Sequence, residues 1–317
     1  MNFRLNKDIW ILSALLVGTL VSRAQRTIEV SYASDMQGNY QFTCNNHAFC
    51  TYIVEIEFTS MEHAHADHAL PFREEVKPGN NKLFKLIRDN GNDPVQFKYK
   101  TSNHKGCINP NANPDFTYLF PIRPGKEAQV YEMTSPEKSS PGEPESRNWY
   151  VIRIKMKPGD TIFSARRGIV SAMDVSSNLN DSGGTSASHE NYIEIVHADC
   201  SFGHYGILKK DGAFVKPGQL VESGKPIGLV GGDRFGRGAE IRFSVYYNRE
   251  DDLSGGNSGA MRKMYWVYVP LQFWTRRKGK GKLIHGANYT SEFPTDILNQ
   301  ELPKPESKNK KPKVKAK

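Results

Sequence analysis

Histidines and acids cluster in two parts of this sequence, and both parts contain side chains that can bind a metal ion. The segment 61–68 contains three histidines and two acids: Glu62, His63, His65, Asp67 and His68. That number of donors is sufficient for a metal site. The alanines between them favour an exposed loop, so adventitious metal or none is the preferred interpretation. The second cluster, His197, Asp199 and His204, lies in the C-terminal half.

The first 24 residues resemble a signal peptide. Basic Arg4 and Lys7 precede an apolar stretch that is too short to cross a membrane comfortably, and small residues end it before a cut after Ala24. An uncleaved N-terminal anchor is the alternative. We therefore expect an exported protein that is located in the periplasm, at the cell surface or outside the cell.

Export matters for the four cysteines, because periplasmic and extracellular compartments permit disulfides. Cys44 and Cys50 are close enough in sequence to staple a tight loop. Cys107 and Cys200 would then remain to pair across two domains. Four cysteines allow three connectivities, and the sequence does not choose among them. Free buried thiols are the alternative.

The formal net charge of +9 is concentrated at the two ends of the chain. Residues 304–317 contain seven lysines and one glutamate, and residues 1–24 add a net +2, which leaves about +1 for the remainder. A basic tail without apolar residues to bury is expected to be disordered and to contact anionic surfaces only weakly. The charge therefore gives no reason to expect a nucleic-acid partner.

Short alternations of apolar and polar residues, separated by turn residues, predict an all-β protein. In 51–59, for example, Val54, Ile56 and Phe58 alternate with polar residues, as in a strand with one buried face. We predict the following organisation: a signal peptide at 1–24, a β-sandwich at 25–131, a linker or exposed loop at 132–148, a second β-domain at 149–291 and a basic disordered tail at 292–317.

Three ordered segments of the second domain resemble the lysostaphin/LytM-type zinc endopeptidases, whose fold is the duplicated hybrid motif. The segments are residues 157–170, beginning Lys157-Pro-Gly-Asp, residues 191–199, with Val196-His-Ala-Asp at the end, and residues 215–231, beginning Val215-Lys-Pro-Gly-Gln. The resemblance covers roughly residues 149–275. A biotinyl or lipoyl carrier shares the last segment's turn pattern, but it would leave the other two segments unexplained.

The resemblance implies a zinc ion held by a histidine, an aspartate and the second histidine of a His-x-His strand. Two further histidines would assist the attack of water on peptidoglycan or peptide bonds. The metal-ligand positions that can be aligned are Arg153 and Arg242, and the catalytic positions are Ile207 and Glu240. No histidine occurs between His104 and His189, so the first ligand has no candidate.

These replacements predict a degenerate site, with neither a catalytic residue nor a bound cofactor. Arginine remains protonated and has no lone pair to donate, so it opposes a divalent cation. If both arginines face the inherited groove, they could pair with Glu240 in place of the metal. Ordinary solvent-facing strand residues are the alternative. The residues expected to line the groove are Arg153, His189, His204, Tyr205, Glu240 and Arg242.

Three functions remain open at this point. The first is a non-catalytic pseudopeptidase that binds a cell-wall peptide or an envelope protein. The second is an active zinc endopeptidase with displaced ligands, for which His189, His204 and Glu240 are the candidates. The third is a structural component of a surface assembly. Zinc content separates the second from the others, and binding to cell-wall material separates the first from the third.

Overall fold

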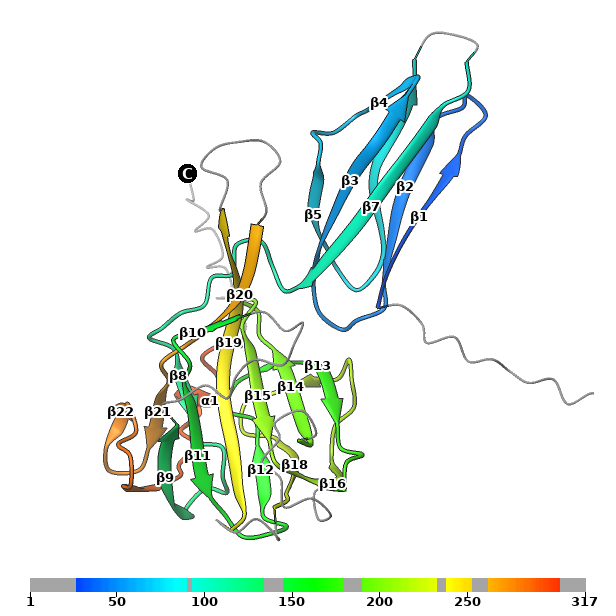
Figure 1. Ribbon diagram of the computed structural model, residues 1–317. Coiled ribbons are helices and arrows are strands. Elements are labelled where there is room, and N and C mark those ends of the chain that lie inside the picture. Colours follow the sequence, from blue (N-terminus) through cyan, green and yellow to red (C-terminus); the bar gives the residue numbers. More distant parts are fainter. Residues whose placement is uncertain are drawn as a thin grey trace, which may run out of the picture.

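The computed structural model describes residues 27–89, 93–133, 145–178, 190–232, 238–252 and 262–302. Within these ranges the chain forms 23 strands and one four-residue helix, so the expectation of an all-β protein is confirmed. No helix among the described residues is long and apolar enough to cross a membrane. The predicted signal peptide and residues 303–317 of the predicted tail lie outside the described ranges. Figure 1 shows two bodies that meet at a narrow junction.

The N-terminal body is a β-sandwich of two antiparallel sheets, in the orders β1-β2-β6-β4 and β5-β3-β7. Its strands are β1 (Ile28–Ser34), β2 (Tyr40–Asn46), β3 (Tyr52–Glu62), β4 (Ala64–Ala66), β5 (Phe72–Val76), β6 (Gly79–Arg88) and β7 (Gln96–Lys105). Inward-facing aromatic side chains fill the space between the sheets; Phe42, for example, stacks on Phe84 with ring centroids 4.7 Å apart. This confirms the predicted sandwich.

The C-terminal body is built on one large sheet with smaller sheets packed beside it (Figure 1). The large sheet has the order β17-β13-β14-β15-β19-β11-β9-β23, with β20 paired to β19 and β10 to β20. Its strands are β9 (Glu127–Met133), β10 (Glu145–Arg147), β11 (Val151–Lys155), β13 (Gly168–Asp174), β14 (Tyr192–Val196), β15 (Phe202–Gly206), β17 (Leu220–Val221), β19 (Glu240–Asp252), β20 (Arg262–Tyr268) and β23 (Asn288–Thr290).

Two three-stranded sheets complete this body, in the orders β12-β18-β16 and β22-β21-β8. Their strands are β8 (Thr117–Leu119), β12 (Thr161–Phe163), β16 (Leu208–Ala213), β18 (Pro226–Val230), β21 (Gln272–Thr275) and β22 (Gly279–Gly281), and the helix is α1 (Thr295–Leu298). Two positions in this body require glycine, one because of its backbone conformation and one because another strand lies too close for a side chain. Gly159 adopts φ 79°, and a Cβ on Gly168 would lie 2.4 Å from the Val196 carbonyl oxygen.

Two predicted boundaries differ from the structure. β8 pairs with β21, and β9 pairs with β11 and β23, so the segment 106–131 contributes strands to the C-terminal body rather than to the sandwich. The sandwich strands end at Lys105. Part of the predicted tail is also ordered, because α1 lies within 292–302 and Ile297 is buried. Local apolar patterns identify strands but not the sheet that each strand joins.

One disulfide and two ion pairs connect the two bodies among the described residues. Cys107, just beyond β7, is bonded to Cys200 in the turn between β14 and β15. The Lys105 ammonium contacts the Glu194 carboxylate, and Arg73 Nη2 lies 2.5 Å from Glu250 Oε2. A link made of both covalent and ionic contacts fixes the sandwich against one end of the large sheet.

The short-loop disulfide between Cys44 and Cys50 is not formed in the structure. Both residues are buried free thiols. Cys44 lies on β2 and points into the sandwich core, whereas Cys50 lies at the junction with the C-terminal body. Their side chains therefore enter different environments, although only five residues separate them in the sequence.

Candidate functional site

β11 and β19 place two arginines and one glutamate together on one face of the large sheet. The two strands are antiparallel neighbours in which Arg153 lies directly opposite Arg242. The alternate residues Ile152, Ile154 and Ile241 are buried in the core. Because successive side chains point to opposite faces of a strand, Arg153, Glu240 and Arg242 share the other face.

Glu240 forms ion pairs with both arginines. One carboxylate oxygen lies 3.4 Å from Arg153 Nη1, and the other lies 3.6 Å from Arg242 Nε. Arg242 Nη1 also donates a hydrogen bond of 3.1 Å to Glu190 Oε2. The residue Glu240 is 3% exposed, so solvent screens these contacts only weakly. Arg153 and Arg242, at the aligned metal-ligand positions, and Glu240, at an aligned catalytic position, thus form one network with Glu190, which the resemblance did not assign.

This set of residues does not fit a zinc ion. Neither arginine has a lone pair, and each carries a charge that repels a cation. Ile207, at one of the two aligned catalytic positions, is 1% exposed and contributes only an apolar side chain. Among the residues that the structure describes, no group of three or more His, Cys, Asp or Glu side chains is placed to hold a metal ion.

The two predicted groove residues on β15 point in opposite directions. His204 stacks on the Tyr192 ring with centroids 5.1 Å apart and lies opposite Ser244 of β19. Burial lowers the pKa of His204 to about 4, so its imidazole is neutral at pH 7. Tyr205 is fully buried in the core, where its hydroxyl oxygen accepts a hydrogen bond from the Ala165 N–H. Tyr205 therefore does not line the groove, as strand alternation requires once His204 faces outward.

The candidate ligands for a displaced zinc site do not converge. His204 is opposite Ser244, four residues along β19 from Glu240, which corresponds to about 13 Å of strand. Zinc–ligand bonds are only about 2.0–2.2 Å long, so His204 and Glu240 cannot share one ion in this arrangement. The third candidate, His189, lies outside the described residues.

A second buried acid on the same sheet face was not predicted. Glu194 accepts hydrogen bonds from the Ser171 hydroxyl at 2.5 Å and the Tyr246 hydroxyl at 2.7 Å, and it contacts the Lys105 ammonium. Burial alone would raise the pKa of Glu194, but the Lys105 charge and these donors lower it. Tyr246 lies on the same face of β19 as Arg242, so the sandwich covers one end of the face that carries the arginines.

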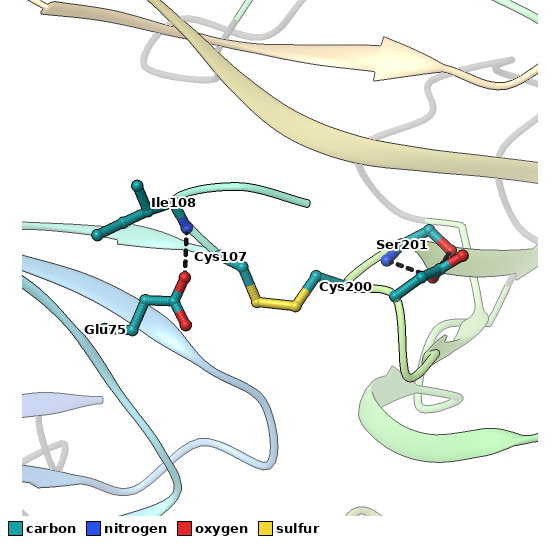
Figure 2. The surroundings of a disulfide bond; sticks show 6 residues. Glu75, Cys107, Ile108, Cys200 and Ser201 are labelled. Carbon is teal, nitrogen blue, oxygen red and sulfur yellow. Dashed lines mark hydrogen bonds between the residues drawn. A yellow bond between two sulfur atoms is a disulfide. The ribbon is translucent and has the colours of Figure 1, made fainter. Parts of the chain in front are cut away.

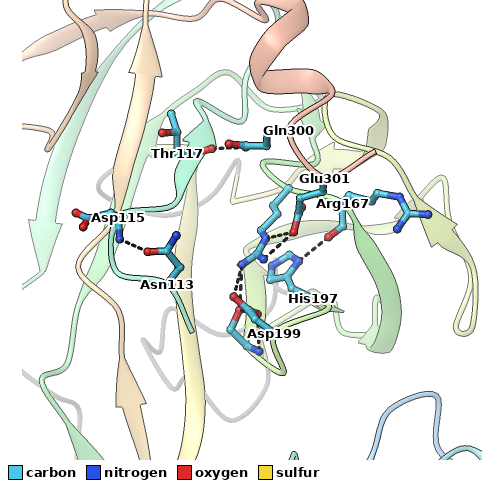
Figure 3. Close-up of polar contacts among 10 residues, drawn as sticks. Asn113, Asp115, Thr117, Arg167, His197, Asp199, Gln300 and Glu301 are labelled. Atoms are coloured by element: carbon cyan, nitrogen blue, oxygen red, sulfur yellow. Dashed lines mark hydrogen bonds and ion pairs between the residues drawn. The ribbon is translucent and has the colours of Figure 1, made fainter. Parts of the chain in front are cut away.

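A third network, around Arg166, holds the turn that contains Cys200. Arg166 is buried and donates to Asp199 at 2.8 Å and to Glu301 at 2.7 Å. His197 Nδ1 lies 2.8 Å from the Arg167 carbonyl oxygen, and burial, followed by the Arg166 charge, lowers the pKa of His197 to about 3 (Figure 3). His197 and Asp199 of the second cluster therefore have a structural role in this turn, whereas His204 lies on β15.

The 61–68 cluster also forms separate pairs rather than one site. His65 Nδ1 lies 2.7 Å from Asp89 Oδ1, whereas His68 Nδ1 lies 3.3 Å from Asp67 Oδ1. His63 adopts φ 58° between β3 and β4. The three histidines of this segment thus have different surroundings.

Comparison with known proteins identifies the family of the C-terminal body. Residues 147–252, about a third of the chain, match Peptidase family M23. This range includes β11, β13–β15 and β19, and with them the Arg153–Glu240–Arg242 network. The chain therefore contains an M23 domain in its C-terminal half, preceded by the β-sandwich.

Solved structures give weaker similarity over longer stretches. A candidate glycyl-glycine endopeptidase LytM from Ruminococcus gnavus is 15% identical with a TM-score of 0.27, over 46% of this chain and 56% of that one. The chain thus spans just over half the length of that structure. Csd3 from Helicobacter pylori is 14% identical with a TM-score of 0.29, over 80% and 77% of the two chains. A candidate M23 peptidase from Pseudomonas aeruginosa is 10% identical with a TM-score of 0.27, over 61% and 82%. No curated protein sequence matches the chain.

Proposed function

We propose that this protein is an exported, non-catalytic M23 homologue, a pseudopeptidase that binds peptides of the bacterial cell envelope. The observation that carries the proposal is the ion-pair network of Arg153, Glu240 and Arg242 at the aligned zinc-site positions. A site that holds two guanidinium groups in place of metal ligands has lost the means to activate water through a metal. What remains at these positions is a cluster of guanidinium and carboxylate groups, which is suited to recognition rather than to metal-dependent hydrolysis.

The donors of the network support a peptide as the ligand. The Nε–H groups of Arg153 and Arg242 are buried, and Arg242 Nε faces Glu240 Oε1 at 3.6 Å, but the two arginine side chains remain 15% and 16% exposed, and a ligand can contact this exposed part. Guanidinium groups bind carboxylates and other oxygen acceptors well because several N–H donors lie in one plane. Cell-wall peptides supply such acceptors through their carbonyl and carboxylate oxygens. M23 domains as a family act on peptidoglycan peptides, which agrees with this ligand class.

The disulfide between the two bodies supports export. Disulfides persist in oxidising compartments and are rare in the cytosol. The Cys107–Cys200 bond agrees with the signal peptide expected at residues 1–24. The protein would then act in the periplasm or outside the cell, where the cell wall is accessible to it.

The test combines binding and hydrolysis on the same material. The chain without residues 1–24 is incubated with purified peptidoglycan, with and without added zinc, and is then sedimented. We expect the protein to sediment with the wall and to release no soluble peptide under either condition. The double change Arg153→Gln and Arg242→Gln should weaken sedimentation. Arg167→Gln, which removes an exposed ion pair with Glu222, is the matched control.

Two results would contradict the proposal. Release of peptides that depends on zinc would establish an active endopeptidase. Failure to sediment with peptidoglycan, when the protein is folded by circular dichroism, would leave no support for a cell-wall ligand.

A further inference from the structure

Three of the four cysteines surround a single cleft at the junction of the two bodies. Cys50, Cys107 and Cys200 all line this cleft, whose volume is about 300 Å³. Cys107 and Cys200 form the disulfide, whereas Cys50 is a buried free thiol. Cys44, the other free thiol, lies in the sandwich core and is not among the residues that line the cleft.

The ladder between β3 and β7 ends beside Cys50 and Cys107. Tyr52 pairs with Lys105, and the Gly106 N–H donates a hydrogen bond of 2.9 Å to the Thr51 carbonyl oxygen, which extends the same register by one step. The next residues along the chain are Cys50 and Cys107, which lie beyond the last ladder pair, where Gly106 adopts φ 111°. Cys50 and Cys107 thus each adjoin one of the two residues joined by this hydrogen bond, and both line the same cleft. Cys50 is therefore the free thiol placed beside the disulfide.

We propose that Cys50, Cys107 and Cys200 form a thiol–disulfide exchange site in which Cys107 pairs with either Cys200 or Cys50. The Cys50 thiol first loses its proton to solvent. The resulting thiolate attacks the Cys107 sulfur, so that a Cys50–Cys107 bond forms as the Cys107–Cys200 bond breaks. Cys200 leaves as a thiolate and takes up a proton. One thiol and one disulfide exist before and after, so the step consumes no oxidant or reductant.

The exchange changes the connection between the two bodies. In the present isomer the disulfide joins the sandwich to the M23 domain. In the other isomer the disulfide lies within the sandwich and its junction segment. The contacts that remain between the bodies are then non-covalent, such as Lys105 with Glu194 and Arg73 with Glu250. On the sandwich side, Glu75 accepts a hydrogen bond from the Ile108 N–H at 2.7 Å, next to the disulfide (Figure 2).

The position of Cys50, rather than its acidity, selects it as the attacking group. Burial raises the pKa of Cys50 to about 12 and that of Cys44 to about 11, so Cys44 is the more acidic thiol. Only about 1 in 10⁵ Cys50 side chains is a thiolate at pH 7, and the thiolate is the nucleophile. The exchange should therefore be slow at neutral pH and accelerate about tenfold per pH unit.

The direct test removes the present partner of Cys107. The chain without residues 1–24 that carries Cys200→Ser is oxidised in air, alkylated under denaturing conditions without reductant, and mapped by mass spectrometry of its peptides. We expect a Cys50–Cys107 disulfide and an alkylated Cys44. Adding Cys44→Ser should leave this bond intact, whereas adding Cys50→Ser should abolish it. Alkylated Cys107, or a Cys44–Cys107 bond, in the folded Cys200→Ser protein would overturn the proposal.

A second measurement uses the unchanged sequence, so that it does not depend on how the variants fold. The protein is held at pH 7, 8 and 9 without added thiol, quenched with acid and mapped in the same way. We expect the Cys50–Cys107 isomer to appear, about tenfold faster with each pH unit. A map that contains only Cys107–Cys200 at every pH after prolonged incubation would also overturn the proposal.

Discussion

Replacing Glu240 with glutamine should destabilise the M23 domain strongly. Glu240→Gln keeps the shape of the side chain but removes the negative charge that pairs with Arg153 and Arg242. The two arginines are cross-strand neighbours, and their side chains are 15% and 16% exposed. Without the carboxylate, two like charges would face each other with little solvent to screen them.

The size of the effect follows from the distances. Two charges about 3.5 Å apart attract by about 4–5 kcal/mol at an effective dielectric constant of about 20, before desolvation is subtracted. Breaking a buried pair by removing one partner typically costs about 3–5 kcal/mol. Arg242 keeps Glu190 at 3.1 Å, which retains part of the stabilisation. We therefore expect the free energy of unfolding to fall by about 2–4 kcal/mol.

The assay is urea denaturation followed by circular dichroism, with Glu222→Gln as the control. Glu222 pairs with Arg167 at 2.9 Å, but the two side chains are 38% and 33% exposed, so the control should lose less than about 1 kcal/mol. Adding Arg153→Met to Glu240→Gln should restore part of the lost stability, because it removes one uncompensated charge. A loss below about 1 kcal/mol for Glu240→Gln would refute the claim that this carboxylate holds the arginine pair.

Three further predictions concern the junction and the histidine beside it. Lys105→Met leaves Glu194 buried without its counter-charge, and it should lower the free energy of unfolding by about 3–5 kcal/mol in urea titrations. The pKa of His204 is depressed to about 4, so between about pH 6.5 and 4 the unfolded chain binds a proton that the folded chain does not. The free energy of unfolding should therefore fall by about 1.4 kcal/mol per pH unit because of this histidine as the pH falls through that window. His204→Gln should abolish this contribution to the slope of unfolding free energy against pH. An unchanged slope would contradict the assignment. Cys200 adopts φ 65°, a conformation that glycine adopts without strain, so Cys200→Gly should be about 1 kcal/mol more stable than Cys200→Ser. Both variants lose a disulfide that spans 93 residues and contributes about 4–5 kcal/mol.

Local patterns were sufficient to predict the kind of fold but not all the strand partners. The alternation in 51–59 and the glycine-containing turns predict strands correctly, because burial of one strand face is a property of neighbouring residues. Which sheet a strand joins depends on pairing far along the sequence. β9, for example, pairs with both β11 and β23, a partnership that no short segment of sequence reveals. For the same reason the predicted sandwich extended to residue 131 instead of ending near Lys105.

The arginine network could be anticipated because its members occupy aligned positions on known strands. The burial of Tyr205 could also have been predicted, since it follows His204 directly on β15 and adjacent residues on a strand face opposite ways. The sequence could not predict the role of Glu190 or the Lys105–Glu194 pair, because their partners come from distant parts of the chain. Ion pairs of this kind leave no periodic signal in the sequence.

The central claim is that arginines at the zinc-ligand positions leave this M23 domain unable to hold zinc. The most direct measurement is the zinc content of the untagged chain without residues 1–24, determined by elemental analysis after dialysis against trace zinc and then against metal-free buffer. The account predicts far less than one zinc ion per chain, and no change when Arg153 and Arg242 are both replaced by glutamine. One zinc ion per folded chain, retained through dialysis, would contradict it.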